Sequence, residues 1–280
     1  MDIKAADVKA LREATGAGMM DCKKALVECN GNAEEAAKLL KEKGLAAVAK
    51  RAERTTSEGR IFIKQEGNKA VIAELTCETD FVANNADFIA VGEKIVDTAL
   101  AKNFSEPNEE LSNLLLDLAT KIRENMTIRR LQIVDIPAGC TFAKYVHSDA
   151  KTGVIVIVKS EPACDNSKIA EFAYDCCLHI AAFTPQFITK DDVDAKYLAE
   201  QEEIFKAQVE QDEKSASKPE NVKAGIVQGK IKKHLASICF VDQMFVKDDK
   251  VTVTAKKDQI AKECGCTLSF EKIVSYQLGA

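Results

Sequence analysis

The chain of 280 residues has no tryptophan, only three histidines and no long apolar run. Its longest strongly apolar stretch, residues 154–158, is far shorter than the about 20 residues that a membrane-spanning helix requires. The N-terminal residues do not combine a positively charged segment with an apolar one, so we expect no secretory signal. The sequence therefore predicts a cytoplasmic protein without a membrane segment.

An excess of positive charge is also lacking. The chain has 39 lysines and arginines against 44 aspartates and glutamates, which gives a formal net charge of -5. Proteins that bind nucleic acid through its phosphates usually carry a basic face. We therefore expect no direct contact with nucleic acid, although residues 230–233, Lys-Ile-Lys-Lys, form a local basic patch.

The motifs of common enzyme classes are absent. We find no phosphate-binding G-x-x-x-x-G-K-[ST] loop, no G-x-G-x-x-G after a strand and no G-x-S-x-G elbow. Gly16 and Gly18 form a G-x-G, but they join two predicted helices, where glycine is a common cap. The three histidines are not in a ligand pattern. We therefore predict no catalytic residue, no metal site and no cofactor.

Cysteine, by contrast, is plentiful, with ten residues. Without a secretory signal, free thiols are expected rather than disulfides. Neither Cys264-Gly265-Cys266 nor Cys176-Cys177 has the C-x-x-C spacing of a zinc site. Cys176 and Cys177 lie on the apolar face of a predicted helix, where cysteine behaves as a small hydrophobe. A redox or metal enzyme built on these residues is accordingly our third functional hypothesis.

Residues 1–55 predict a compact helical module followed by a linker. The pattern indicates three short helices, at 7–14, 19–29 and 32–44, separated by glycine-containing turns. Gly44 is expected to end the third helix, and residues 44–54 read as a helical linker.

Two similar patterns, each a strand hairpin followed by a helix, then occur at 59–102 and 142–183. Because a hairpin buries one face, each helix is expected to cover a sheet face, which predicts an α+β fold with two related core subdomains, 56–141 and 142–280. Further elements are expected as helices at 109–123 and 252–263 and as strands at 129–136, 238–246 and 267–274.

Residues 191–234 interrupt the second subdomain. They are rich in glutamate, glutamine and lysine, with sparse apolar positions and a turn before Pro219. This pattern predicts an inserted antiparallel helical hairpin. Its thin apolar stripe fits either a partner-binding surface or a solvated spacer, and the residues leave both open.

The segment Glu78-Thr79-Asp80-Phe81-Val82-Ala83 stands between a predicted strand and a predicted helix. Turns at such places lie on the surface, where a rigid scaffold can present side chains to a partner. Aromatic residues also often seal such turns. Phe81 is therefore either a tip that reaches into another molecule or a plug in the chain's own core, and spacing alone does not decide.

Two further features are unusual. Met19 and Met20 begin a predicted helix beside a glycine turn, and because neighbouring helical positions point about 100° apart, both can hardly be core. The ordinary expectation is one buried and one exposed methionine. Methionine is also favoured at binding surfaces. His147 is expected at the tip of the second strand hairpin, where a solvated role and a functional role are both open.

Residues 15–26, Thr-Gly-Ala-Gly-Met-Met-Asp-Cys-Lys-Lys-Ala-Leu, and residues 79–83, Thr-Asp-Phe-Val-Ala, together closely resemble the elongation factor Ts family. The resemblance covers the whole chain and includes Ile128-Arg129-Arg130. It implies an N-terminal ubiquitin-associated-like bundle, two α+β core subdomains and a helical hairpin that projects from the second.

The resemblance also implies a function, that of a non-enzymatic guanine nucleotide exchange factor in translation elongation. Such a factor binds elongation factor Tu in its GDP-bound and nucleotide-free forms, displaces magnesium and GDP, and allows GTP to load. The residues implied to dislocate the partner's magnesium are Thr79, Asp80, Phe81 and Val82. The other residues implied to bind the partner are Met19, Met20, Lys23 and His147. A homodimer through the helical hairpin is left open.

The alternative from another class is an RNA-associated accessory factor that uses the helical bundle and residues 230–233. The acidic balance of the chain counts against it, and so does the lack of aromatic residues interleaved with the basic ones.

Overall fold

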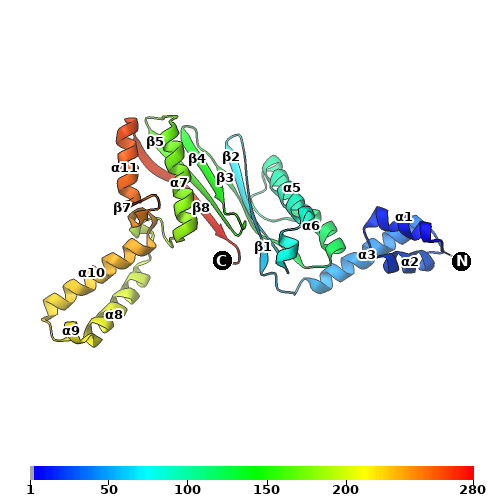
Figure 1. Ribbon diagram of the computed structural model, residues 1–280, viewed down its shortest axis with the longest axis horizontal. Helices are drawn as coiled ribbons and strands as arrows, with labels where there is room; N and C mark the ends of the chain where they lie inside the picture. The colour runs from blue at the N-terminus through cyan, green and yellow to red at the C-terminus, as the bar shows by residue number, and fades with distance from the viewer. Residues whose placement is uncertain (1–2) are drawn as a thin grey trace. The chain divides into compact units, whose positions relative to one another are not determined.

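The computed structural model describes residues 3–280 (Figure 1). The contacts among these residues divide them into two compact units. The first unit contains residues 3–135 together with residues 146–153 and 276–280. The second contains residues 136–145 and 154–275. These units are defined by contacts, so the division into 1–55, 56–141 and 142–280 remains a prediction. Among residues 3–280, none of the helices combines the length and the apolar character that a membrane span would require.

The first unit begins with three helices, α1 (Ala5–Thr15), α2 (Met19–Glu28) and α3 (Ala33–Arg51). Asn32 starts α3, because its side-chain oxygen accepts hydrogen bonds from two backbone N–H groups of the first turn. The helices share a small core of their own, consisting of Val8, Leu11, Cys22, Ala25, Leu26 and Ala36. The predicted three-helix bundle is confirmed.

The predicted end of the third helix at Gly44 was wrong, because α3 continues to Arg51 without a break. A Cβ atom at Gly44 would lie 2.4 Å from Cγ2 of Thr120 in α6 (Glu109–Ile122). Glycine is therefore present where two helices approach closely, and not because the helix ends there.

A three-stranded antiparallel sheet follows, formed by β1 (Glu58–Glu66), β2 (Lys69–Cys77) and β3 (Met126–Asp135) with β2 in the centre. α5 (Ala86–Lys102) and α6 supply the rest of the core, as predicted from their helical spacing. Alternate residues of β2, from Val71 to Cys77, face these helices.

The opposite face of β2 carries a fully buried carboxylate, Glu74. Arg130 Nε lies 2.6 Å and Arg129 Nη1 3.1 Å from its two oxygens, and the backbone N–H of Gly279 donates to Oε1 at 2.9 Å. Arg130 also stacks over the ring of Tyr276 at 4.1 Å. The final residues of the chain are thus held against the first sheet through Glu74.

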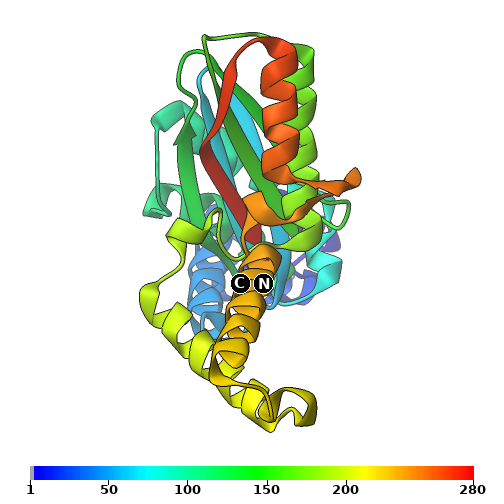
Figure 2. The same ribbon diagram turned by 90° about the vertical axis from the view of Figure 1, so that its left-hand side faces the viewer.

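The second unit is built on the sheet β4 (Cys140–Val146), β5 (Thr152–Glu161) and β8 (Thr267–Gln277), with β5 in the centre. α7 (Ser167–Phe183) and α11 (Val253–Cys264) lie side by side against it (Figure 2). Cys176 and Cys177 are fully buried in this core, which confirms their assignment to the apolar face of a helix. All ten cysteines are free thiols.

The strand predicted at 238–246 was wrong. Residues up to Ile238 belong to α10 (Glu220–Ile238), a 3₁₀ turn spans Phe240–Asp242, and only Met244–Phe245 form β6, which pairs with β7 (Asp248–Thr252). Phe240 and Phe245 are buried side chains of the core. The apolar residues that suggested a strand therefore fill the interior from a turn and a two-residue strand.

The predicted helical hairpin is confirmed as α8 (Ala195–Gln211) and α10, which lie side by side and are joined through the short α9 (Glu213–Ala216) (Figure 2). A 3₁₀ turn at Lys190–Asp192 precedes it. Near its base, Tyr197 Oη and His234 Nε2 are hydrogen-bonded at 2.8 Å.

His179 in α7 is expected to make the second unit sensitive to acid. Its Nδ1 accepts a hydrogen bond from the backbone N–H of Val246 at 3.1 Å, so the ring is neutral and Nε2 donates to Gln243 Oε1 at 2.8 Å. Burial lowers the pKa of His179. Below pH about 6.5 the unfolded chain takes up a proton that the folded chain resists, so the free energy of unfolding falls until the pH reaches the lower, folded-state pKa.

The measurement is chemical denaturation between pH 5 and 7.5, in the wild type and in His179→Gln. For each chain, the free energy of unfolding is plotted against pH. The difference between the slopes of the two plots is the contribution of His179, because glutamine does not titrate. Equal slopes would show that the folded protein accommodates the protonated ring.

Candidate functional site

Phe81 lies on a one-turn helix, α4 (Asp80–Ala83), that follows the end of β2. The side chain of Phe81 is 85% exposed, whereas the next two residues, Val82 and Ala83, are buried in the core of the first unit. Phe81 is therefore not a plug in the core of its own unit, and its side chain projects from the surface. We call residues 79–83 the tip.

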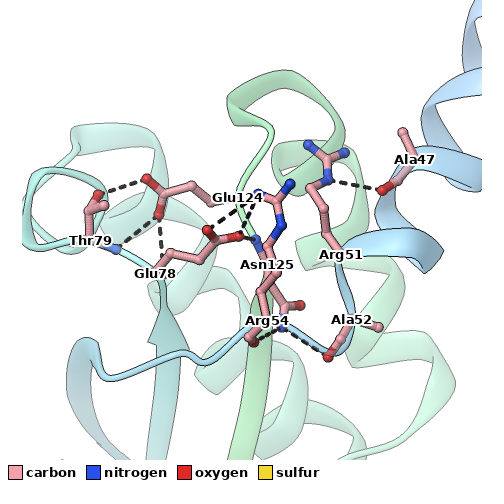
Figure 3. Close-up of polar contacts among 8 residues, drawn as sticks. All are labelled: Ala47, Arg51, Ala52, Arg54, Glu78, Thr79, Glu124 and Asn125. Carbon is pink, nitrogen blue, oxygen red and sulfur yellow. Dashed lines mark hydrogen bonds and ion pairs between the residues drawn. The ribbon is translucent and has the colours of Figure 1, made fainter.

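A network of four residues, Arg54, Glu78, Glu124 and Asn125, lies at the start of the tip, beside Thr79, and we call it the neck network (Figure 3). One oxygen of the Glu124 carboxylate accepts from the backbone N–H groups of Glu78 and Thr79, at 3.2 and 3.1 Å. Its other oxygen accepts from the hydroxyl of Thr79 at 2.7 Å. Both oxygens of Glu124 are thus committed to the start of the tip.

The neck network also connects Glu78 to Asn125 and to Arg54. The carboxylate of Glu78 accepts from the backbone N–H of Asn125 at 2.6 Å and pairs with Arg54 Nη1 at 3.4 Å. The buried side chain of Asn125 donates to the carbonyls of Ala52 and Arg54, at 3.1 and 2.8 Å (Figure 3). The chain leaving α3 is therefore held by the residue that follows Glu124.

The far end of the tip is held by Asn84 and Arg60. The side chain of Asn84 donates to the carbonyl of Asp80 at 2.9 Å, and Arg60 Nη1 donates to Asn84 Oδ1 at 2.9 Å. The carboxylate of Asp80 itself is exposed. Backbone contacts at both ends therefore fix the tip, while the side chains of Asp80 and Phe81 project from it.

Cys77 lies directly before the tip but carries no reactive thiolate. Its thiol is buried and donates to the carbonyl of Thr79 at 3.2 Å. Burial, followed by the charge of Glu124, raises the pKa of Cys77 to about 12. Among the described residues 3–280, no group of three or more histidine, cysteine or acidic side chains is arranged to hold a metal ion.

Met19, Met20 and Lys23 share one exposed region on the first turns of α2. Met19 is 46% and Met20 62% exposed, so neither methionine is a core residue and the expectation of one buried methionine was wrong. Lys23 is exposed one turn further along, at the i+3 and i+4 spacing that places side chains on one face. Val27, exposed seven residues after Met20, extends the same face and was missed, although its helical spacing pointed to it.

His147 is exposed in the turn between β4 and β5. This turn belongs to the first unit, where the carbonyl of Ala150 accepts from the backbone N–H of Ile61 at 2.7 Å. Lys151 Nζ also pairs with Glu58 at 2.6 Å, and this contact raises the pKa of Lys151. The turn that carries His147 thus contacts β1 through Ala150 and Lys151, in the unit that also holds the tip.

Comparison with known proteins agrees with these features. The family profile described as Elongation factor TS matches residues 78–280, a range that begins one residue before the tip. The chain is 59% identical to Elongation factor Ts of Treponema denticola, across 100% of this chain and 99% of the relative. It is 48% identical to that of Treponema pallidum (100% and 99% covered) and 37% identical to that of Clostridium acetobutylicum (99% and 92% covered). With its exposed Phe81 tip, the chain therefore belongs to the elongation factor Ts family of translation elongation factors.

Proposed function

We propose that the chain is a guanine nucleotide exchange factor that binds elongation factor Tu-GDP, displaces magnesium and GDP, and leaves the partner free to load GTP. The observation that carries the proposal is the tip: a fully projecting phenylalanine on a backbone that is held at both ends. Such a group is built to enter a pocket of another molecule, because nothing in its own unit covers it. The exchange takes place in the cytoplasm, and the chain needs no cofactor and no active site of its own.

The mechanism acts through the partner's magnesium. Mg²⁺ requires near-octahedral oxygen geometry, so a small displacement of its ligands removes much of its hold on the nucleotide. Phe81 supplies the apolar wedge, and Asp80 places a negative charge beside the partner's metal and phosphate site. Thr79 and the buried Val82 shape the tip from within.

The required energies are of the right order. Because coupling is reciprocal, a factor that weakens nucleotide binding is itself weakened by nucleotide. A nucleotide that binds with a nanomolar dissociation constant has a binding free energy of about 12 kcal/mol. To release it 10⁴-fold faster, the factor must supply roughly 5.5 kcal/mol of differential binding. A buried aromatic anchor contributes about 2–4 kcal/mol, and a charged hydrogen bond about 1.5–3 kcal/mol.

The remaining partner contacts are assigned to the exposed face of α2 and to the turn between β4 and β5. Met19 and Met20 supply adaptable apolar area and Lys23 a positive charge. His147 is proposed to contact the partner at another place.

Release of a fluorescent GDP from elongation factor Tu tests the proposal directly. At catalytic amounts of the chain we expect the release rate to rise by at least about 10³-fold, with excess magnesium opposing the effect. The control is the same titration with the heat-unfolded chain. A native chain that leaves the release rate unchanged would refute the exchange function.

A further inference from the structure

The tip cannot hold its own shape. α4 has four residues, and isolated helices shorter than about 12 residues are marginal in water. Its internal cap is weak, because the backbone N–H of Val82 lies 3.4 Å from Thr79 Oγ1. The burial of Val82 and Ala83 anchors the underside of the turn, but the first residues of the tip need partners from elsewhere in the chain.

Glu124 supplies those partners. It lies 45 residues from Thr79 in the sequence, yet it accepts three hydrogen bonds there, from two backbone N–H groups and one hydroxyl. In the opposite direction, the carboxylate of Glu78 accepts a hydrogen bond from the backbone N–H of Asn125 at 2.6 Å. Each of the two segments, 78–79 and 124–125, thus offers a carboxylate to the backbone of the other.

We propose that Glu124 is a positioning residue for Phe81: its carboxylate holds the start of α4 so that the ring projects in one orientation before the partner arrives. The inference rests on the proposed exchange function and deepens it. Glu124 does not touch the partner in this account and acts only through the backbone of the tip.

For binding, the contacts of Glu124 mean that the tip already has its docking orientation before the partner arrives. A tip that samples several orientations is competent to dock for only a fraction of the time, and the apparent dissociation constant rises by the inverse of that fraction. Once docked, the same Phe81 side chain occupies the same pocket. Loss of Glu124 should therefore raise the concentration of chain needed for half-maximal exchange, while the maximal rate at saturation changes little.

Three substitutions separate positioning from direct charge contact. Glu124→Ala removes all three acceptor contacts. Glu124→Gln keeps the length of the side chain, an oxygen for the two backbone N–H groups and an NH₂ group that can donate to the Thr79 hydroxyl. Glu124→Asp keeps the charge but is one methylene too short to span the same contacts. A positioning role therefore ranks glutamine above aspartate, whereas a charge that acts on the partner ranks aspartate above glutamine.

The first readout is amide hydrogen exchange of the free chain, which needs no partner. In Glu124→Ala we expect the amides of Ala83 and Asn84, which bond within the tip, to exchange about 10- to 100-fold faster. The amides of β2 should be unchanged, which shows that the sheet stays folded. Glu124→Gln should restore most of the protection. Unchanged exchange of the tip amides in Glu124→Ala overturns the proposal, whatever the partner assay shows.

The second readout is nucleotide release from elongation factor Tu over a range of chain concentrations. We expect Glu124→Ala to raise the half-saturating concentration about tenfold and to leave the maximal rate within about twofold of wild type. Glu106→Ala is the matched control: it also removes an acidic side chain of the first unit, but an exposed one outside the neck network, so the effect should be below about twofold. The proposal is overturned if Glu124→Asp has a lower half-saturating concentration than Glu124→Gln. It is also overturned if the tip of Glu124→Ala becomes mobile while the half-saturating concentration stays the same. If the wild-type chain does not accelerate release, the exchange function fails, and hydrogen exchange still decides whether Glu124 holds the tip.

Discussion

Phe81→Ala is expected to lower the efficiency with which the chain accelerates GDP release by about 30- to 1,000-fold. Truncation of an aromatic anchor that fills a partner's pocket typically costs about 2–4 kcal/mol, and each 1.36 kcal/mol corresponds to a factor of ten in rate. The loss should appear in the maximal rate, because the wedge acts while the nucleotide is leaving. The measurement is stopped-flow release of fluorescent GDP at saturating chain.

The same substitution is expected to leave the fold intact. Because Phe81 is 85% exposed, its removal takes almost no apolar contact from the core, and the free energy of unfolding should change by less than about 0.5 kcal/mol. Phe183→Ala is a matched control, since it also truncates an exposed phenylalanine, at the end of α7. It should leave the maximal exchange rate within about threefold of wild type. Unfolding of Phe81→Ala, with normal exchange by the fraction that remains folded, would contradict the tip assignment.

The contrast between Phe81 and its neighbours explains why the sequence could not decide between tip and plug. Phe81, Val82 and Ala83 are all apolar, and a one-turn helix is too short for any periodicity to show. The family resemblance favoured the tip, and the side-chain burial in the structure agrees with it. Long elements such as α5, α6 and α7 were predicted well, because several turns of regular spacing specify a helix.

The neck network was not predicted, and its residues explain why. Glu78 and Glu124 belong to a chain with 44 acidic residues, most of which are solvated, so no local pattern distinguishes them. Their roles depend on the pairing of β2 with β3, which brings Cys77 opposite Met126 and so places 78–79 beside 124–125. A contact that arises from strand register between distant segments is not visible in the composition of either segment.

The errors at Gly44 and at 238–246 have a related cause. In both places a local signal, a glycine or a short apolar run, was produced by tertiary packing. Gly44 makes room for Thr120, and Phe240 and Phe245 fill a core from a turn and a two-residue strand. Sequence rules consider only residues that are close along the chain. They therefore interpret such residues as signals of secondary structure and miss the tertiary contact that explains them.

Ile128-Arg129-Arg130, one of the segments that carried the family resemblance, has a physical role in the structure. Both arginines pair with Glu74, whose side chain is fully buried on the face of β2 away from α5 and α6. Buried acidic residues are rare unless they are paired and hydrogen-bonded. Here Arg129, Arg130 and the N–H of Gly279 together occupy both carboxylate oxygens.

Glu74→Ala is therefore expected to destabilise the first unit by about 3 kcal/mol, because it leaves two arginines without the carboxylate that they share. The side chains of Arg129 and Arg130 are 40% and 33% exposed. Water can therefore still solvate their charges, and the loss of stability should lie at the low end of the range of about 3–5 kcal/mol for a broken buried ion pair. Glu74→Gln should cost less than alanine, since its amide oxygen still accepts from one donor. Glu106→Ala, at an exposed acidic residue, is the control and should stay within about 0.5 kcal/mol. Urea denaturation gives the free energies, and hydrogen exchange of the Gly279 amide reports release of the C-terminal residues. A Glu74→Ala chain as stable as the control, with Gly279 still protected, would show that the sheet and the chain end do not depend on this carboxylate.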